Sequence, residues 1–233
     1  MKTTLLLFTL IVKALLSYGQ AAELRQLLAV PYDKVKKDLC RLSYKATTFI
    51  YDMNDPRETC DTIHSTVSLD QQGMEILSEY GFSIQRNDTQ IVVDHATRSI
   101  TLSRVQWSYD KLCQQAAQSL LEDCVPVKIF CRTRSGFVDF TIKYKNGSLL
   151  DSAEVSFKGP DRVLNKVSMY YSASAITGEP EGRPVVEMRY GDMRFSRQRE
   201  SGINRLEDVI QIGVAGKLAT RGRYSKYKLV NQL

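Results

Sequence analysis

The sequence predicts an α+β fold, in which antiparallel β-hairpins and a meander pack against several amphipathic helices and disulfides tether the parts. Two runs of alternating apolar residues meet at Asn146-Gly147, the strongest short-range signal for a hairpin. A second alternating pattern over residues 82–102 predicts a three-stranded meander, and residues 24–42 have apolar side chains at helical spacing. The absence of a βαβ rhythm argues against a doubly wound sheet.

Residues 1–19 have the pattern of a secretory signal, with Lys2, the apolar run 5–12 and small residues near the end. Lys13 interrupts the apolar run, and no stretch approaches the ~20 apolar residues that span a bilayer, so we expect no transmembrane segment. The prediction is a secreted protein with a single domain at 20–233. An amphipathic N-terminal helix of a cytosolic protein is the alternative interpretation.

Helices are expected at residues 24–42, 68–81, 108–123 and 206–214. Pro31 interrupts or restarts the first of them. The second has the clearest end signals, because Ser68 and Gln71 form a capping box and Gly81 stands where a C-terminal cap belongs. Residues 163–171 also have helical spacing, although their later half fits a strand equally well.

The strand predictions centre on the Asn146-Gly147 hairpin. A two-residue turn there sets Phe140 opposite Ala153 and Ile142 opposite Asp151, with the apolar residues on one face. In the meander, consistent pairing aligns two rows on one face: Phe82, Val93 and Ile100, and next to them Ile84, Ile91 and Leu102. Further strands or hairpins are expected at residues 46–53, at 62–69 and around Gly191-Asp192.

Five cysteines follow the predicted signal: Cys40, Cys60, Cys113, Cys124 and Cys131. In an oxidising compartment we expect two disulfides and one leftover thiol. A helix over 108–123 separates Cys113 from Cys124 by ~16 Å, so each needs a partner elsewhere. No pair has the CxxC spacing of a zinc site, and we expect no metal and no cofactor. The sequons at Asn87 and Asn146 fall at predicted hairpin tips and are candidate glycosylation sites.

The chain has two histidines, His64 and His95, and these are the candidates for a secreted ribonuclease-like hydrolase. Arg98 or Lys128 would supply the cation beside the developing negative charge, and Glu75 is an alternative base. His95 is also predicted to lie in a turn, where polar residues are common, and His64 lies in a stretch rich in threonine and serine.

Other catalytic signatures are missing from the sequence. Cys131 has Arg132 and Arg134 beside it, which suits a reactive thiol, but Arg132 would point to the opposite face of a strand and secretion favours a disulfide. No G-x-S-x-G elbow, P-loop or G-x-G-x-x-G fingerprint occurs. The sequence therefore favours a protein that is not an enzyme.

A basic C-terminal tail is predicted at about residues 217–233. Without residues 1–19 the chain loses two of its 32 lysines and arginines and none of its 26 acidic residues, so its net charge is +4 rather than +6. Basic residues interleaved with tyrosines suit single-stranded nucleic acid or an anionic surface. The candidate binding residues are Arg221, Arg223, Tyr224, Lys226, Tyr227 and Lys228. A merely solvated chain end is the alternative.

A signal peptide, a compact mature chain, a few cysteines and no catalytic signature together form a profile that resembles the secreted effectors of plant-colonising fungi. This resemblance of composition and layout implies a secreted, non-enzymatic interaction protein of virulence or host-modulating type. Its partner would be a protein of a host or neighbouring cell. The alternatives are the ribonuclease-like hydrolase using His64 and His95, and a cell-surface component held by the basic tail.

Overall fold

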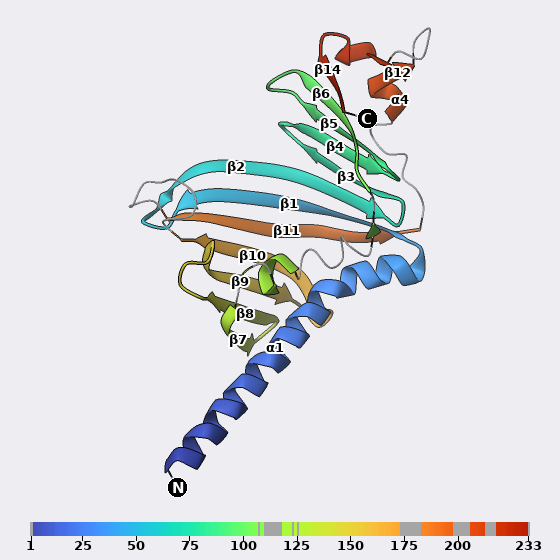
Figure 1. The fold of residues 1–233 in the computed structure, drawn as a ribbon. Helices are drawn as coiled ribbons and strands as arrows, with labels where there is room; N and C mark the ends of the chain where they lie inside the picture. Colours follow the sequence, from blue (N-terminus) through green and yellow to red (C-terminus); the bar gives the residue numbers. More distant parts are fainter. Residues whose placement is uncertain are drawn as a thin grey trace. The chain divides into compact units, whose positions relative to one another are not determined.

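A computed structural model of the chain describes residues 2–106, 108–109, 118–122, 124, 126–172, 183–197, 206–212 and 218–232. The side chains at 2–18, 56–60, 206–207 and 212 lie outside that description. The described chain is mainly β (Figure 1). Its elements are α1 (Lys2–Asp38), β1 (Arg41–Asp52), β2 (Asp55–Asp70), β3 (Gly73–Ser78), β4 (Gly81–Arg86), β5 (Thr89–Asp94), β6 (Ser99–Arg104), β7 (Pro126–Arg134), β8 (Phe137–Tyr144), β9 (Leu150–Lys158), β10 (Val163–Tyr171), β11 (Pro184–Ser196), α4 (Leu206–Val209), β12 (Ile210–Ile212), β13 (Leu218–Thr220), a 3-10 turn (Gly222–Tyr224) and β14 (Lys228–Gln232).

Twelve strands form one largely antiparallel sheet, in the order β14-β6-β5-β4-β3-β2-β1-β11-β10-β9-β8-β7. β14 and β6 are a parallel pair, and β12 with β13 forms a separate two-stranded sheet. The predicted α+β fold with several packed helices is therefore wrong: α1 is the one long helix among the described elements. In the described residues no helix is both long enough and apolar enough to cross a membrane.

The clearest failed helix prediction is the one at residues 68–81, which form the β2–β3 hairpin and its turn. The Asp70 carboxylate accepts hydrogen bonds from the backbone N–H groups of Gln72 and Gly73, at 2.8 and 3.0 Å. Short polar side chains stabilise turns as readily as helix ends, so the apparent capping signal marks a hairpin. Gly81 begins β4 at φ +149°, and a Cβ atom there would collide with the carbonyl oxygen of Val93.

The chain divides into two compact units, and unit 1 comprises residues 1–31, 47–62 and 111–190. Its core lies between α1 and one face of the strands β7 to β10. Leu24 on the helix and Phe140 in β8 are both completely buried, and the rings of Phe140 and Phe157 pack edge to face at 6.0 Å. The predicted helix over 24–42 is thus confirmed up to Asp38, and it continues through Pro31.

The β8–β9 hairpin is confirmed, but its register differs by two residues from the prediction. Phe140 lies opposite Val155 and Ile142 lies opposite Ala153. The turn is longer than two residues: the N–H of Ser148 bonds to the carbonyl of Lys145, and Gly147 has φ +85°. Because the shift is an even number, Ala153 and Val155 keep their predicted face. At the start of β9 the prediction is wrong, since Leu150 is in the core while Leu149 and Asp151 are exposed.

Unit 2 comprises residues 32–46, 63–110 and 191–233. It contains the predicted meander in the predicted register, with Phe82 opposite Val93 and Val93 opposite Ile100. The second predicted row is also confirmed. These residues form a core that Val209 and Tyr224 complete from the C-terminal segment. The local alternation is strong enough here to determine both pairings.

Three further predictions are corrected by the structure. The expected hairpin around Gly191-Asp192 does not form, because β11 runs straight through these residues. Residues 163–171, which fitted either a helix or a strand, are strand β10. The last helix is limited to the four residues of α4 and gives way to β12. Of the predicted helix at 108–123, residues 110–117 lie outside the described part, and residues 118–121 are helical.

The prediction of two disulfides is also wrong. Cys40 and Cys124 are buried and Cys131 is half-buried, and all three are free thiols. Two bridges need four cysteines, and only Cys60 and Cys113 remain, with side chains outside the described part. Burial accounts for the stability of these thiols, since cysteine packs as a small apolar residue. It also raises the pKa of the Cys131 thiol, with the nearby Glu23 carboxylate adding to the effect.

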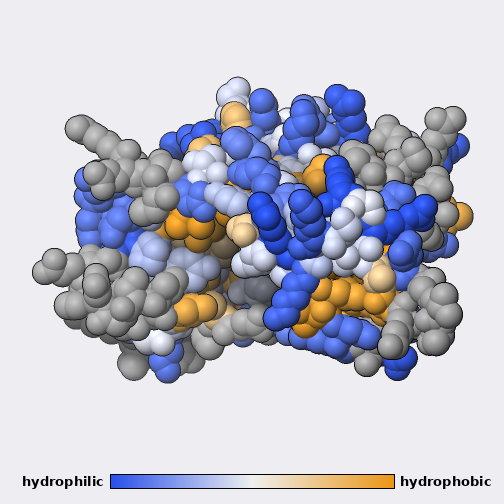
Figure 2. Space-filling view, turned by 90° about the horizontal axis from the view of Figure 1, so that it is seen from above, coloured by the Kyte–Doolittle hydropathy of each residue, from blue (hydrophilic) through white to orange (hydrophobic). Residues whose placement is uncertain are grey.

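The two sequons lie where the sequence placed them. Asn87 is exposed in the β4–β5 turn, with φ +52°, and Asn146 is exposed in the β8–β9 turn. Hydrophilic side chains cover much of the face seen in the space-filling view, and hydrophobic ones reach the surface in separate areas between them (Figure 2).

Replacing Phe140 by alanine should lower the free energy of unfolding by ~3–5 kcal/mol, because it leaves a cavity in the centre of unit 1. The matched control is Phe130→Ala on the opposite face of the neighbouring strand, where the ring is 44% exposed, and this change should cost far less. Urea denaturation of both variants measures the difference. Equal losses would show that Phe140 does not occupy the core.

Thiol counting tests the cysteine assignment. Protein purified without reductant and unfolded in guanidinium should react with a thiol reagent at three or more cysteines, because Cys40, Cys124 and Cys131 are unpaired. Alkylation followed by peptide mapping identifies them. A result of one thiol per chain would restore the two-disulfide arrangement.

Candidate functional site

The candidate site lies on the face of β7 to β11 that is turned away from the core of unit 1, here called the outer face. Side chains alternate along each strand, so burying Val138, Phe140 and Ile142 on one side sends their neighbours to the other. A groove of about 520 Å³ occupies this outer face. Its lining includes Phe130, Arg132, Arg134, Phe137, Asp139, Thr141, Glu154, Ser156, Lys166, Glu187 and Arg189.

Glu187 is the electrostatic centre of the groove. Its side chain is about 10% exposed, and it pairs with Arg189 at 2.6 Å and with Lys166 at 3.6 Å. The hydroxyl of Ser168 donates a further hydrogen bond to it at 3.4 Å. The strand register makes this arrangement, because Ser168 lies directly opposite Glu187 and Lys166 lies opposite Arg189. A buried carboxylate with three partners holds a fixed position.

Two tyrosines beside this centre remain protonated over the physiological range. The hydroxyl of Tyr170 donates to Glu154 at 3.3 Å, and burial together with that carboxylate raises the pKa of Tyr170 to about 12. Burial and the nearby Glu187 also raise the pKa of Tyr51. Both phenols are therefore hydrogen-bond donors near pH 7, and neither is prepared to act as a base.

The rim of the groove at β7 and β8 is cationic and aromatic. Arg134 is held by Asp139 at 2.7 Å, and the guanidinium lies 5.8 Å from the ring of Phe137. Arg132 is exposed, and no ion pair or hydrogen bond to it is seen within the described residues. Phe130 is 44% exposed, with the ammonium of Lys128 lying 4.3 Å from its ring centre.

Lys128 and Lys143 lie directly opposite each other across the β7–β8 ladder, and both are exposed. Like charges in this position repel, so an anion placed between them would be favoured. The outer face therefore combines a fixed polar centre with a rim that offers unneutralised positive charge beside aromatic rings. This arrangement suits binding rather than bond-breaking.

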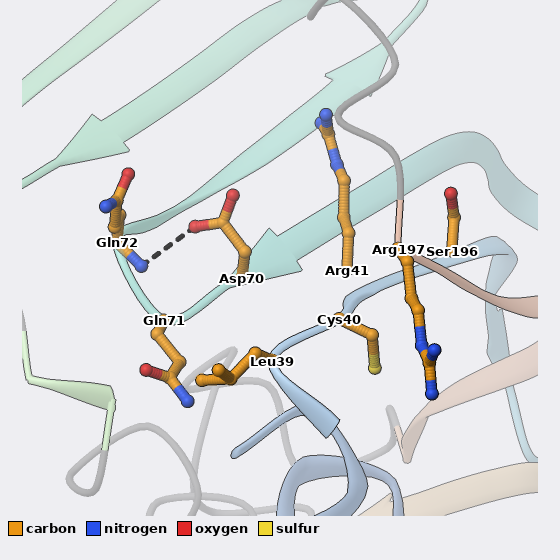
Figure 3. Close-up of a pocket in the computed structure, with 8 residues that line it drawn as sticks. All are labelled: Leu39, Cys40, Arg41, Asp70, Gln71, Gln72, Ser196 and Arg197. Carbon is orange, nitrogen blue, oxygen red and sulfur yellow. Dashed lines mark hydrogen bonds between the residues drawn. The ribbon is translucent and has the colours of Figure 1, made fainter. Parts of the chain in front are cut away.

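A second pocket, of about 290 Å³, lies in unit 2 between the end of α1, the β2–β3 turn and the end of β11 (Figure 3). Arg41 lines it and pairs with Glu75 at 3.0 Å, with both side chains about 10% exposed. The other carboxylate oxygen of Glu75 is buried and has no hydrogen-bond partner. Leu39, with φ +50° and 75% exposed, stands at the pocket edge. The ion pair links β1 to β3 across the intervening strand β2 and so has a structural role.

The two histidines proposed for a hydrolase lie in unit 2 and are both exposed. The backbone N–H of His64 bonds to the Glu79 carboxylate, and Nδ1 of His95 lies 3.1 Å from the hydroxyl of Tyr227. His64 lies within β2 and His95 directly follows β5, three strand spacings away, or about 14 Å between backbones. Neither lines either of the two pockets described above.

The other members of that proposed constellation are also dispersed. Arg98 lies in the β5–β6 turn with φ +49°, Glu75 is paired with Arg41, and Lys128 belongs to unit 1. In the part of the chain that the structure describes, no group of three or more histidine, cysteine, aspartate or glutamate side chains could hold a metal ion.

The predicted C-terminal tail is integrated into unit 2 over residues 218–232. β14 extends the sheet beside β6, and Tyr224 is 2% exposed, packing edge to face on Phe82 at 5.9 Å. Tyr227 packs against the same core and contacts His95. Of the candidate binding residues, the four cations are exposed: Arg221, Arg223, Lys226 and Lys228.

The sequence contains a signal for the outer face in the alternation of its strands. Polar residues alternate with core residues along β8 and β9, as Asp139 and Thr141 do on either side of Phe140. The contributions of β10 and β11 could not be predicted. Residues 163–171 fitted either a helix or a strand, and a hairpin was expected around Gly191-Asp192, within β11. Glu187 and Lys166 could not be brought together without these strands.

No family model matches the chain, and no curated protein matches it significantly. Solved structures are similar at low identity. An uncharacterized conserved protein from Thermus thermophilus has a TM-score of 0.42 and 10% identity, covering 87% of this chain and 97% of that one. A LolA superfamily protein from Nitrosomonas europaea has a TM-score of 0.30 and 11% identity, covering 72% and 92%. A DUF1329 family protein from Desulfovibrio piger has a TM-score of 0.37 and 8% identity, covering 81% and 95%. At these scores the similarities assign neither a family nor a function.

The Arg41–Glu75 pair gives a stability prediction. Glu75→Ala should lower the free energy of unfolding by about 3–5 kcal/mol, because it removes the carboxylate that pairs with the buried Arg41 guanidinium. The control is Lys45→Ala, which breaks the pair of Lys45 with Asp192, whose side chains are 69% and 52% exposed, and which should cost far less. Thermal and urea unfolding compare the two. A small loss for Glu75→Ala would mean that Arg41 reaches water.

Proposed function

We propose that this protein is a secreted, non-enzymatic interaction protein that binds an anionic partner through the outer face of unit 1. The observation that carries the proposal is the cationic and aromatic rim of the 520 Å³ groove. The charged and aromatic side chains of this rim can bind a partner, and the proposal assigns no reaction to them.

The charge balance of the groove supports an anionic partner. Its centre is internally neutralised, because Glu187 holds Lys166 and Arg189, and Asp139 holds Arg134. The cations left over are on the rim: Lys128, Arg132 and Lys143. An acidic group from a partner would relieve the repulsion between the two opposing lysines and satisfy the exposed guanidinium.

The aromatic side chains of the rim support a partner with an apolar component as well. Phe130 and Phe137 both line the groove and lie on the same face as the cations. Aromatic rings next to arginines are frequent in interfaces, since they bury apolar area while the charges provide orientation. Secretion is supported by the signal-like pattern of residues 1–19.

A second surface could serve the same function. The exposed cations Arg221, Arg223, Lys226 and Lys228 lie in unit 2, and residues 217–233 contain no acidic side chain. With Tyr224 buried, base stacking by that ring is not available, so this surface would act through charge.

The experiment measures binding of three fluorescent anionic probes: poly-glutamate, single-stranded poly-uridine and phosphatidylserine vesicles. We expect at least one to bind at 0.1 M salt and to weaken strongly at 1 M, where the Debye length falls from ~10 Å to ~3 Å. Arg132→Glu with Lys143→Glu should weaken binding by about tenfold or more.

The matched variant is Arg221→Glu with Lys226→Glu, which makes the same charge change in unit 2. If this variant alone loses binding, the C-terminal surface is the site and the groove is not. If no probe binds at 0.1 M salt, the proposal fails as a whole.

A further inference from the structure

Resting on the proposed function, we infer that the partner is an extended acidic peptide segment that pairs with the outer edge of β7. The strand β7 is the last in the order of the sheet, next to β8 alone (Figure 1). Within the described residues, no strand and no backbone-to-backbone hydrogen bond reaches its other edge. That edge therefore offers a row of N–H and C=O groups to a further strand.

The usable length of this edge is about one short strand. The pairing of β7 with β8 is irregular at Val127, between Pro126 and Lys128. Proline has no N–H to donate, so the regular edge begins at Lys128 and ends at Arg134. Seven residues of a partner can pair there.

The charges of β7 determine which kind of strand it accepts. Lys128, Arg132 and Arg134 all lie on the outer face, and β7 contains no acidic residue. Pairing of two copies of β7 would bring three cations from each chain together, which opposes self-association. An acidic strand would instead attract Lys128, Arg132 and Arg134. The three cations of β7 therefore disfavour pairing with a second copy of the chain and favour pairing with an acidic peptide.

The two faces of β7 define the pattern of the partner segment. On the outer face its side chains meet Lys128, Arg132 and Arg134, which favours glutamate or aspartate at alternate positions. On the other face β7 carries Ile129 and Cys131, which belong to or pack on the core, and this favours apolar residues between the acidic ones. A nucleic acid could use the charges but not the backbone edge, and therefore a peptide fits more of the observed features.

The test uses a nine-residue peptide with alternating glutamate and valine, and a control of the same composition with all glutamates in one block. Fluorescence anisotropy with the full-length protein should show the alternating peptide binding about tenfold or more tightly. Arg132→Glu should abolish that preference, whereas Arg104→Glu, the same change at an exposed position in β6, should leave it intact.

Single N-methylation along the peptide separates strand pairing from simple charge attraction. Strand pairing uses the N–H groups of alternate residues, so methylation should weaken binding roughly three- to tenfold at every second position and little at the others. Equal effects at all positions, or equal affinity of the two peptides, would overturn the inference while leaving the anionic-partner function standing. If single-stranded RNA or vesicles bind and neither peptide does, the partner class is wrong. If none of the anionic probes binds, the proposed function itself is wrong, and the inference about the peptide fails with it.

Discussion

The packing of α1 on one face of the sheet in unit 1 is the constraint on which the site depends. Leu24, Leu27 and Leu28 bury the side chains of β8 and β9 that point toward the helix. Because successive side chains in a strand alternate, this burial leaves the other face to polar and charged residues. The groove around Glu187 is a consequence of that division, and Lys166 and Arg189 compensate the buried charge of Glu187 by pairing with it.

The two units use the same sheet differently. In unit 2 the meander β4–β6 forms a core with Val209 and Tyr224 from the C-terminal segment, so cations near the chain end are displayed on a folded support. In unit 1 the helix provides the cover, and the exposed cations are on strands β7 and β8. Strands display side chains at regular spacing and with limited freedom, which suits recognition of a regular partner better than a flexible tail would.

The cysteines show that a signal-like sequence at the N-terminus is not sufficient to predict disulfide bonds. Three of the five are free, and two of these, Cys40 and Cys124, are buried, with Cys124 in the core of unit 1. The sheet supplies enough buried apolar surface to stabilise a chain of this length without bridges at Cys40, Cys124 and Cys131. Packing therefore accounts for these free thiols whatever the role of residues 1–19.

The sequence by itself determined the features that depend on neighbouring residues. The meander register followed from its alternation, and the part of α1 from Leu24 to Asp38 followed from its helical spacing. The apolar pattern determined which face of the β8–β9 hairpin carries Phe140 and Val155. Tertiary structure decided what local pattern leaves ambiguous. Residues 68–81 became a hairpin because β3 finds partners on both sides, and β11 remained one strand because long-range pairing outweighs a local Gly-Asp turn signal. The outer face could not be predicted for the same reason, since Ser168, Lys166 and Glu187 meet only through the pairing of β10 with β11.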